Sequence, residues 1–84
     1  MQVTVIAPDR AVFEGDADSL VVPAYDGLVG IEPRHAPFMT LLGKGRLTIK
    51  LGDDVRTFSV QGGFLQVIQD RVRIVAERAE NETQ

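Results

Sequence analysis

Polar and apolar residues alternate along several short stretches of this chain, a pattern typical of strands with one buried face. Residues 2–7 alternate over most of their length, and residues 46–51 alternate strictly. Residues 19–22 are apolar on both faces, which predicts a strand buried on both sides. The same reasoning predicts further strands, around residues 11–14, 57–60, 64–68 and 71–76. The residues predicted to point inward are Leu47, Ile49, Leu51, Phe58, Val60, Val72, Ile74 and Ala76.

Glycine, proline and aspartate separate these stretches and predict where the chain turns. Asp26-Gly27 stands between two apolar runs, which is a strong hairpin signal. Pro23 limits how far the strand before this hairpin can pair as a central strand. Other predicted features are turns at Pro8–Arg10, Gly43–Gly45 and Gly52–Asp54, a bulge or corner at Gly15-Asp16, and a bend or close backbone approach at Gly62-Gly63.

A rigid corner is predicted at residues 33–37, because Pro33 and Pro37 fix φ and bias the residues before them to extended geometry. This corner holds the single histidine, His35. Residues 38–42, which follow it, fit either an extended segment or a short turn of helix. Short strands, frequent turns and no helical period of useful length indicate an all-β fold, a small two-sheet β-sandwich or flattened barrel.

The chain length of 84 residues leaves room for one small domain, which we expect to span residues 1–78. The final residues, from Glu77 to Gln84, are polar and are expected to fray, so residues 79–84 are predicted to be a polar tail. A domain of this size buries only about 60% of the surface of its unfolded chain. Its own stability is therefore expected to be modest, and partners are expected to add to it.

The charge and composition argue against several classes of function. The net charge of -3 and the pI near 4.9 oppose nucleic-acid binding, which relies on basic patches. There is no cysteine for disulfide or thiol chemistry. The first residues lack the pattern of a signal peptide, and no apolar run approaches the roughly 20 residues that span a bilayer. We expect a soluble chain, or one attached to another protein.

His35 is the first candidate for chemistry, because a histidine near carboxylates can act in acid–base catalysis. Asp26 and Glu32 could supply a carboxylate, but the same stretch contains no serine nucleophile. We favour the interpretation that His35 is hydrogen-bonded at the corner, shapes the loop and is available to touch a partner. No catalytic residue is predicted.

No metal, nucleotide or cofactor site is predicted either. One histidine and no cysteine exclude the usual zinc ligand sets within one chain. The paired aspartates, at 16 and 18 and at 53 and 54, lack the spacing of a calcium loop and are better interpreted as turn residues. The glycines do not form a phosphate-binding loop.

Two other features allow alternative interpretations. Lys44, predicted at a turn tip, suggests a biotin- or lipoyl-type carrier acylated on that lysine, although most turn lysines are simply solvated. Leu28 and Val29 stand beside a turn where polar residues are commoner. They either point into the core or form an apolar tip that contacts another protein.

The central stretch, Asp26-Gly27-x-x-Gly30-Ile31-x-Pro33-x-His35-Ala36-Pro37, resembles the signature of the epsilon subunit of F-type ATP synthases, which is called delta in mitochondria. The flanking segments agree with it: Val12-Phe13-Glu14-Gly15, Val60-x-Gly62-Gly63-Phe64-Leu65 and Val75-Ala76-Glu77. The resemblance is collinear from about Val3 to Ala79, so it covers nearly the whole chain.

The resemblance implies a β-sandwich at the foot of the central stalk, a part of the rotor that does no chemistry and binds no cofactor. In the family this domain binds the gamma subunit on one side and rests on the polar loops of the membrane c-ring. It is therefore attached to the membrane only indirectly, on the cytoplasmic face of the bacterial inner or plasma membrane or an equivalent. Carried over by position, the c-ring-facing loop comprises Asp26, Gly27, Leu28, Val29 and Gly30, and the gamma-facing residues are Ala7, His35 and Thr40.

The chain departs from the family pattern in two places. Many members carry an acidic residue where this chain has Leu28, so a charged contact to the c-ring would have to come from Asp26 or Glu32. Long members continue into a C-terminal helical hairpin that inhibits ATP hydrolysis and can bind ATP, whereas this chain stops at Gln84. We therefore expect neither inhibition by that route nor nucleotide binding.

Overall fold

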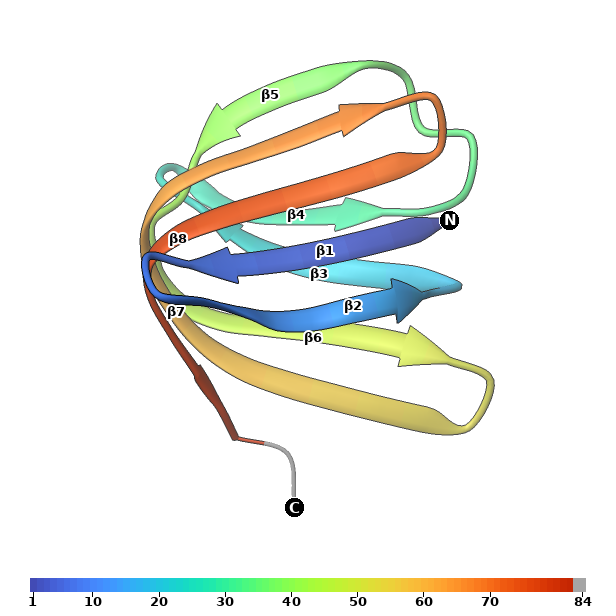
Figure 1. Cartoon of the computed structure of the whole chain (residues 1–84). Helices are drawn as coiled ribbons and strands as arrows, with labels where there is room; N and C mark the ends of the chain where they lie inside the picture. The colour runs from blue at the N-terminus through green and yellow to red at the C-terminus, as the bar shows by residue number, and fades with distance from the viewer. Residues whose placement is uncertain (83–84) are drawn as a thin grey trace.

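The computed structural model describes residues 1–82, and every regular element in that range is a β-strand (Figure 1). The strands are β1 (Gln2–Ala7), β2 (Arg10–Asp16), β3 (Ser19–Ala24), β4 (Gly27–Ile31), β5 (Phe38–Leu41), β6 (Lys44–Leu51), β7 (Asp54–Ile68) and β8 (Arg71–Asn81). The all-β prediction is thus confirmed. Residues 38–41, which the pattern left open, form a strand.

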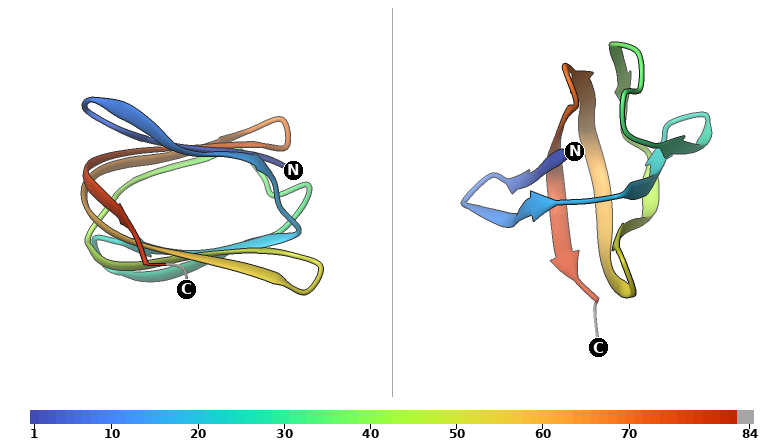
Figure 2. Two further views of the ribbon diagram at one scale, coloured as in Figure 1. Left: turned by 60° about the horizontal axis from the view of Figure 1, so that its bottom comes forward. Right: turned by 90° about the vertical axis from the view of Figure 1, so that its right-hand side faces the viewer.

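The strands pair in the order β2-β1-β8-β7-β6-β3-β4, and β5 also pairs with β7. β1 and β8 are parallel, and every other pair is antiparallel. Figure 2 shows that this continuous sheet folds into two facing layers, the β-sandwich expected from the sequence. The first layer contains β1, β2, β5, residues 64–68 of β7 and residues 71–76 of β8; the second contains β3, β4, β6 and residues 54–61 of β7.

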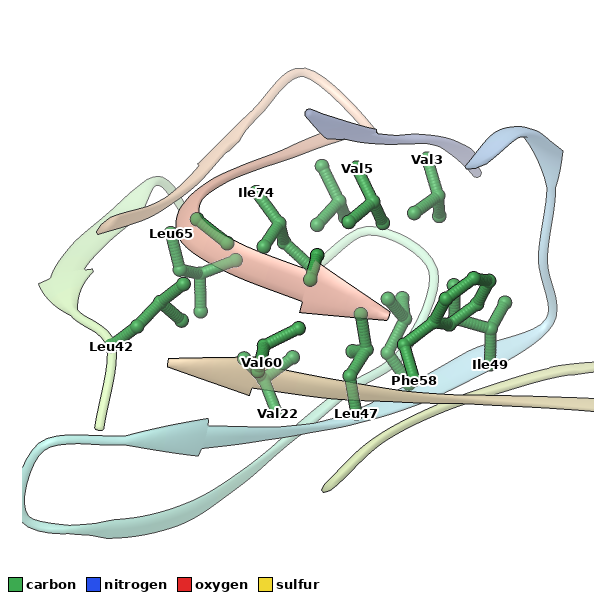
Figure 3. Close-up of a cluster of buried hydrophobic side chains, with 14 of the residues drawn as sticks. Val3, Val5, Val22, Leu42, Leu47, Ile49, Phe58, Val60, Leu65 and Ile74 are labelled. Atoms are coloured by element: carbon green, nitrogen blue, oxygen red, sulfur yellow. The ribbon is translucent and has the colours of Figure 1, made fainter. Parts of the chain in front are cut away.

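The core lies between the layers and is built from alternate residues of the long strands (Figure 3). Its largest fully buried side chains include Phe58, Leu47 and Leu65. All but one of the residues predicted to point inward are buried. The exception is Leu51, which is 45% exposed because it stands next to the hairpin loop at the end of β6. β3 is not buried on both faces, since Val21 is 38% exposed.

Strand β7 changes layers at Gly62-Gly63, where both residues have positive φ, 68° and 102°. A Cβ atom on Gly63 would collide with the backbone carbonyl oxygen of Val75 on β8. Only glycine combines this backbone conformation with so close an approach. The predicted bend and close approach are therefore both present.

The turn predicted at Gly43–Gly45 is wrong. β6 already begins at Lys44, and the chain runs on from β5 with only Leu42 and Gly43 between the two strands. A Cβ on Gly43 would lie 2.8 Å from the carbonyl oxygen of Ala24, and one on Gly45 would lie 2.9 Å from Cβ of Pro23. These glycines let β3 pass close to the chain, and they do not reverse its direction.

The prediction that the C-terminal residues fray is also wrong, as far as residue 81. β8 continues to Asn81, with Ala79 buried opposite Val60 of β7. The amide of Glu82 donates to the carbonyl of Thr57 at 2.8 Å. Backbone pairing with β7 orders this polar segment, so the boundary predicted at residue 79 falls within a strand. Residues 83–84 of the predicted tail lie outside the described residues.

Two smaller predictions are modified. The bulge lies at Val12, where the register between β1 and β2 shifts, whereas Gly15 stays paired with Val3. Pro23 does limit pairing: β3 pairs with β6 only as far as Val21, while on its other side Pro23 still lies opposite Leu28 of β4.

Candidate interaction surfaces

The hairpin between β3 and β4 forms an exposed tip. Ala24 pairs with Gly27, which leaves Tyr25 and Asp26 as the turn, one residue earlier than the Asp26-Gly27 signal suggested. Gly27 has φ of 137°, a conformation that favours glycine. Tyr25 is 67% exposed and Leu28 is 72% exposed. The tip, residues 25–28, thus presents two large apolar side chains beside one carboxylate.

Leu28 and Val29 have different environments. Leu28 lies opposite Pro23 and points to solvent, whereas Val29 lies opposite the buried Val22 and packs against the core. Of the two interpretations left open by the sequence, the apolar tip therefore applies to Leu28 and the core position to Val29.

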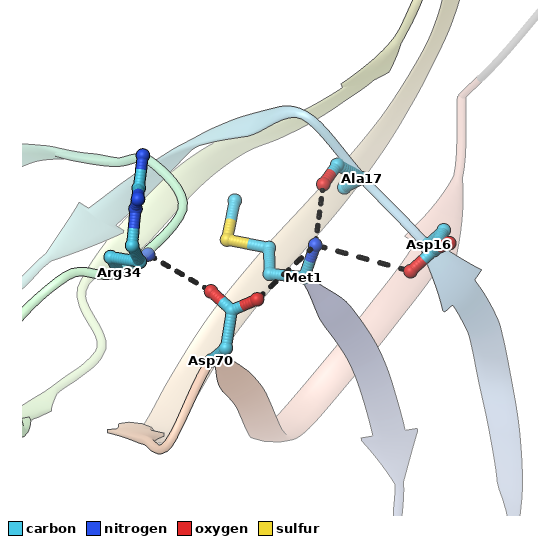
Figure 4. Close-up of polar contacts among 5 residues, drawn as sticks. All are labelled: Met1, Asp16, Ala17, Arg34 and Asp70. Carbon is cyan, nitrogen blue, oxygen red and sulfur yellow. Dashed lines mark hydrogen bonds and ion pairs between the residues drawn. The ribbon is translucent and has the colours of Figure 1, made fainter.

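The corner at residues 32–37 is held by a carboxylate from another turn. Asp70, between β7 and β8, accepts a hydrogen bond from the backbone amide of Arg34 at 2.9 Å (Figure 4). Arg34 has φ of 64°, which few non-glycine residues adopt, so this contact stabilises an unfavourable conformation. The same carboxylate lies 3.9 Å from the amino group of Met1, which donates to the carbonyl of Ala17. Asp70 therefore joins the corner to the start of β1.

His35 takes part in the structure of this corner. Its amide donates to the carbonyl of Glu32 at 3.2 Å, and its Nδ1 is 2.8 Å from the carbonyl oxygen of Ala36. Its ring lies 5.8 Å from the ring of Phe38 at the start of β5. Asp26 is at the opposite end of β4, so the structure does not bring it to His35. These contacts agree with a histidine that shapes the loop.

The remaining predicted residues are spread over three strands. Ala7 ends β1 and is only 5% exposed, with its side chain in the core. Thr40 is half-buried on β5, opposite the buried Leu65. Lys44 is exposed in β6 opposite Gln61 and does not occupy a hairpin tip.

Sequence reasoning missed an apolar row on the outer surface of the first layer. Ile6 of β1 lies opposite Val75 of β8, Val75 lies opposite Phe64 of β7, and Phe64 lies opposite Leu41 of β5. We call these four residues the apolar row. The signal for it was present in Phe64-Leu65 and Ile74-Val75, because adjacent apolar residues in an alternating strand must face opposite sides. The register that aligns the four strands is not visible in the sequence.

Across residues 1–82, no three His, Asp or Glu side chains gather in a way that could hold a metal ion. The same range contains no helix long and apolar enough to cross a membrane.

The chain matches a known protein family along its described length. Residues 1–82 match the family model described as "ATP synthase, Delta/Epsilon chain, beta-sandwich domain". The chain is 42% identical over 77 residues to the ATP synthase epsilon chain of Leptospira borgpetersenii, covering 92% of this chain and 61% of the relative. It is 40% identical over 76 residues to the epsilon chain of Caulobacter vibrioides, covering 90% and 88%. This chain thus spans about three fifths of the length of the first of these relatives.

Solved structures contain the same fold. A chain in the cryo-EM structure of the Euglena gracilis mitochondrial ATP synthase superposes with a TM-score of 0.87 at 20% identity, over 94% of this chain and 51% of that one. A chain in the central stalk and c-ring structure of the Tetrahymena thermophila mitochondrial ATP synthase gives 0.79 at 16% identity, over 94% and 64%. At such identities the likeness supports the fold alone.

Proposed function

Since the chain belongs to the delta/epsilon-chain family of ATP synthases, in its β-sandwich domain, we propose that it is a non-catalytic subunit of the central stalk, or rotor, of an F-type ATP synthase. In this role it links the gamma subunit to the membrane c-ring and supports the coupling of proton transport to ATP synthesis. The observation that carries the proposal is the family match over residues 1–82, together with about 40% identity to epsilon chains.

The segment that we propose faces the c-ring comprises Asp26, Gly27, Leu28, Val29 and Gly30, and it overlaps the tip. The exposure of Leu28 supports a direct contact there. Val29 contributes differently, because its side chain packs on the core and so anchors the tip. Asp26 is exposed in the turn and offers a carboxylate to the polar loops of the ring.

The gamma-facing residues proposed from the family resemblance are Ala7, His35 and Thr40. His35 lies in a corner whose shape is maintained by Asp70, which supports a role in a defined contact. The buried side chain of Ala7 means that a partner would meet its exposed neighbours, such as Pro8, and not Ala7 itself. Through gamma and the ring, the chain would sit peripherally on the cytoplasmic face of the bacterial inner or plasma membrane.

The carrier alternative has less support. Carrier domains present their lysine at a hairpin tip, whereas Lys44 lies within the β6–β7 ladder. The backbone around Lys44 pairs on one side with β7, so the lysine does not stand in a turn. We therefore assign Lys44 no chemical role.

Co-purification with a tagged gamma subunit from the same organism tests the proposed function. The full chain is expected to co-elute with gamma, and with the c-ring when detergent-solubilised complexes are purified. Recovery of the chain without gamma would contradict the proposal. An intact mass that shows an acyl adduct on Lys44 would favour the carrier instead.

A further inference from the structure

We propose that Asp26 is a site of spontaneous backbone modification, where the Asp26-Gly27 linkage isomerises to an isoaspartyl linkage through a succinimide. The modified bond lies in the segment proposed to face the c-ring. Its effect on assembly therefore rests on the proposed function, whereas the chemistry does not. The isomerised chain is expected to keep its fold and to lose the contact made by the tip.

The reaction uses only water and groups that Asp26 and Gly27 already carry. The backbone nitrogen of Gly27 attacks the side-chain carboxyl carbon of Asp26, and a new C–N bond closes the succinimide ring. One water leaves, taking the hydroxyl of the carboxyl group and the proton of the amide. A second water then opens the ring at either carbonyl. When it opens at the main-chain carbonyl, the chain stays connected through Cβ and Cγ of Asp26, which is the isoaspartyl form.

Gly27 removes the steric barrier that slows this reaction after other aspartates. A side chain on the following residue hinders the approach of the carboxyl carbon to the backbone nitrogen, and glycine has none. Nothing lies within 4 Å of the position that a Cβ of Gly27 would occupy, so neighbouring segments do not block the approach either. Among the aspartates of the sequence, Asp26 alone is followed by glycine.

The carboxylate of Asp26 is free to take part in the reaction. Its side chain is exposed, and it forms no hydrogen bond or ion pair with another residue of the range 1–82. Neither Tyr25 nor Asp26 has positive φ, so this two-residue turn is not one of the primed types that match the twist of the flanking strands. The carboxyl group can therefore rotate toward the nitrogen of Gly27 without breaking a contact.

Two other turn aspartates separate the two requirements. Asp53, between β6 and β7, is exposed and has no such partner among the described residues, but Asp54, which carries a side chain, follows it. Asp70, between β7 and β8, accepts the hydrogen bond from the Arg34 amide at 2.9 Å and lies 3.9 Å from the amino group of Met1. An arginine follows it. Asp53 thus lacks the glycine, and Asp70 lacks both the glycine and the free carboxylate.

Isomerisation changes the tip without reaching the core. The isoaspartyl linkage adds one carbon atom to the main chain, a bond length of about 1.5 Å. The turn joins a register in which Ala24 pairs with Gly27, so the added atom displaces this end of β4. The exposed side chain of Leu28, the next residue, moves with it. Val29 stays packed against the core, and the strands beyond it keep their pairing.

Ageing the purified full chain at neutral pH and physiological temperature tests the chemistry. Isoaspartate is located by peptide mapping with electron-transfer fragmentation, which cleaves the two linkages into different fragments. We expect several-fold more isoaspartate at Asp26 than at Asp53 or Asp70. Asp26→Glu is expected to prevent the modification, because the longer side chain closes the corresponding ring more slowly. Asp54→Gly is expected to make Asp53 a second site. Accumulation at Asp26 that does not exceed that at Asp53 in the unmodified sequence would overturn the proposal.

The effect on assembly is tested with gamma subunit and detergent-solubilised c-ring from the same organism. The isomerised chain, separated from the unmodified one by chromatography, is expected to co-purify with the c-ring several-fold less well. Its melting temperature is expected to be unchanged, which excludes unfolding as the cause. Treatment with protein-isoaspartate methyltransferase and S-adenosylmethionine, which regenerates the aspartyl linkage, is expected to restore assembly.

The outcomes distinguish this inference from the proposed function. If the unmodified chain assembles and the isomerised chain assembles equally well, the effect assigned to the modification is wrong while the proposed function stands. If the unmodified chain does not assemble with gamma and the c-ring, the proposed function is wrong, whereas isomerisation at Asp26 is decided by the ageing experiment alone.

Discussion

The two outer faces of this sandwich differ, although the two layers share one fold and one core. On the first layer the apolar row runs without interruption across four strands. The corresponding row of the second layer, aligned by the same kind of register, reads Gly30, Val21, Thr48 and Thr57. One neighbouring row contains Ser19, Lys50 and Val55, and the row on the other side contains Arg46 and Ser59.

The packing of the core does not account for this difference between the two outer faces. Both layers contribute fully buried aliphatic residues, such as Leu47 from the second and Ile74 from the first. Folding is therefore satisfied by the inward positions, and the outward positions are free to vary. An apolar outer face that folding does not need is best explained by a partner, whereas the polar outer face is suited to water. The predictions below test this contrast, from the largest expected effect to the smallest.

The largest effect is expected from Gly63→Ala, which removes the bend that creates two separate faces. The new methyl group would collide with the carbonyl of Val75, and alanine would have to adopt a φ of 102°. We expect a loss of about 3 kcal/mol or more of the free energy of unfolding, measured by urea titration. Gly30→Ala is the matched control, because nothing lies within 4 Å of its added Cβ. It is expected to leave stability within about 1 kcal/mol, and equal losses in both variants would contradict the role given to the bend.

The next largest effect is expected in β4, where the same substitution should have different consequences at the adjacent residues Val29 and Leu28. Val29→Asp places a carboxylate against the core and is expected to cost about 2–3 kcal/mol of stability. Leu28→Asp, on a side chain that is 72% exposed, is expected to change the melting temperature of the free chain very little. In the assembled complex it is expected to weaken rotor assembly or proton coupling. A large fall in the melting temperature of Leu28→Asp would show that Leu28 belongs to the core, and its contact role would then be wrong.

A smaller effect is expected at Asp70, in the β7–β8 turn of the first layer. Asp70 has φ of 63°, which glycine and asparagine tolerate. Asp70→Gly removes the acceptor for the Arg34 amide and is expected to cost about 1 kcal/mol. Asp70→Asn retains a carbonyl acceptor and is expected to cost less. Amide exchange within residues 32–37, measured by NMR, should accelerate in the glycine variant, and an unchanged rate would remove the anchoring role.

Much of the fold follows from local sequence patterns. Strict alternation predicted the inward positions of Leu47 and Ile49, and Gly62-Gly63 predicted a bend that is present. The predictions that failed concern residues whose conformation depends on contacts with another strand. Gly43 was interpreted as a turn, but it is required because β3 passes close by, and sequence cannot distinguish these two uses of a missing Cβ. Residues 77–81 were predicted to fray because they are polar and close to the chain end, but residues 58–61 of β7 pair with residues 78–81 and order them.

The sequence predicted one of the candidate surfaces, the tip, but not the contacts that shape the others. The hairpin signal at Asp26-Gly27 located the tip to within one residue. The anchoring of the corner by Asp70 was invisible, since 36 residues separate Asp70 from Arg34. The apolar row was invisible for a related reason: each member is an ordinary strand residue, and only the register of four strands aligns them.

The most direct test of the contrast between the two faces is hydroxyl-radical footprinting of the full chain, alone and bound to gamma subunit. Met39, Leu41 and Phe64 report on the first layer, and Val21 and Val55 report on the second. We expect the first three to lose most of their reactivity in the complex, because gamma covers them, and the two valines to keep theirs. Protection of Val21 and Val55 with continued reactivity of Met39 and Leu41 would contradict the account, because gamma would then bind the face assigned to water.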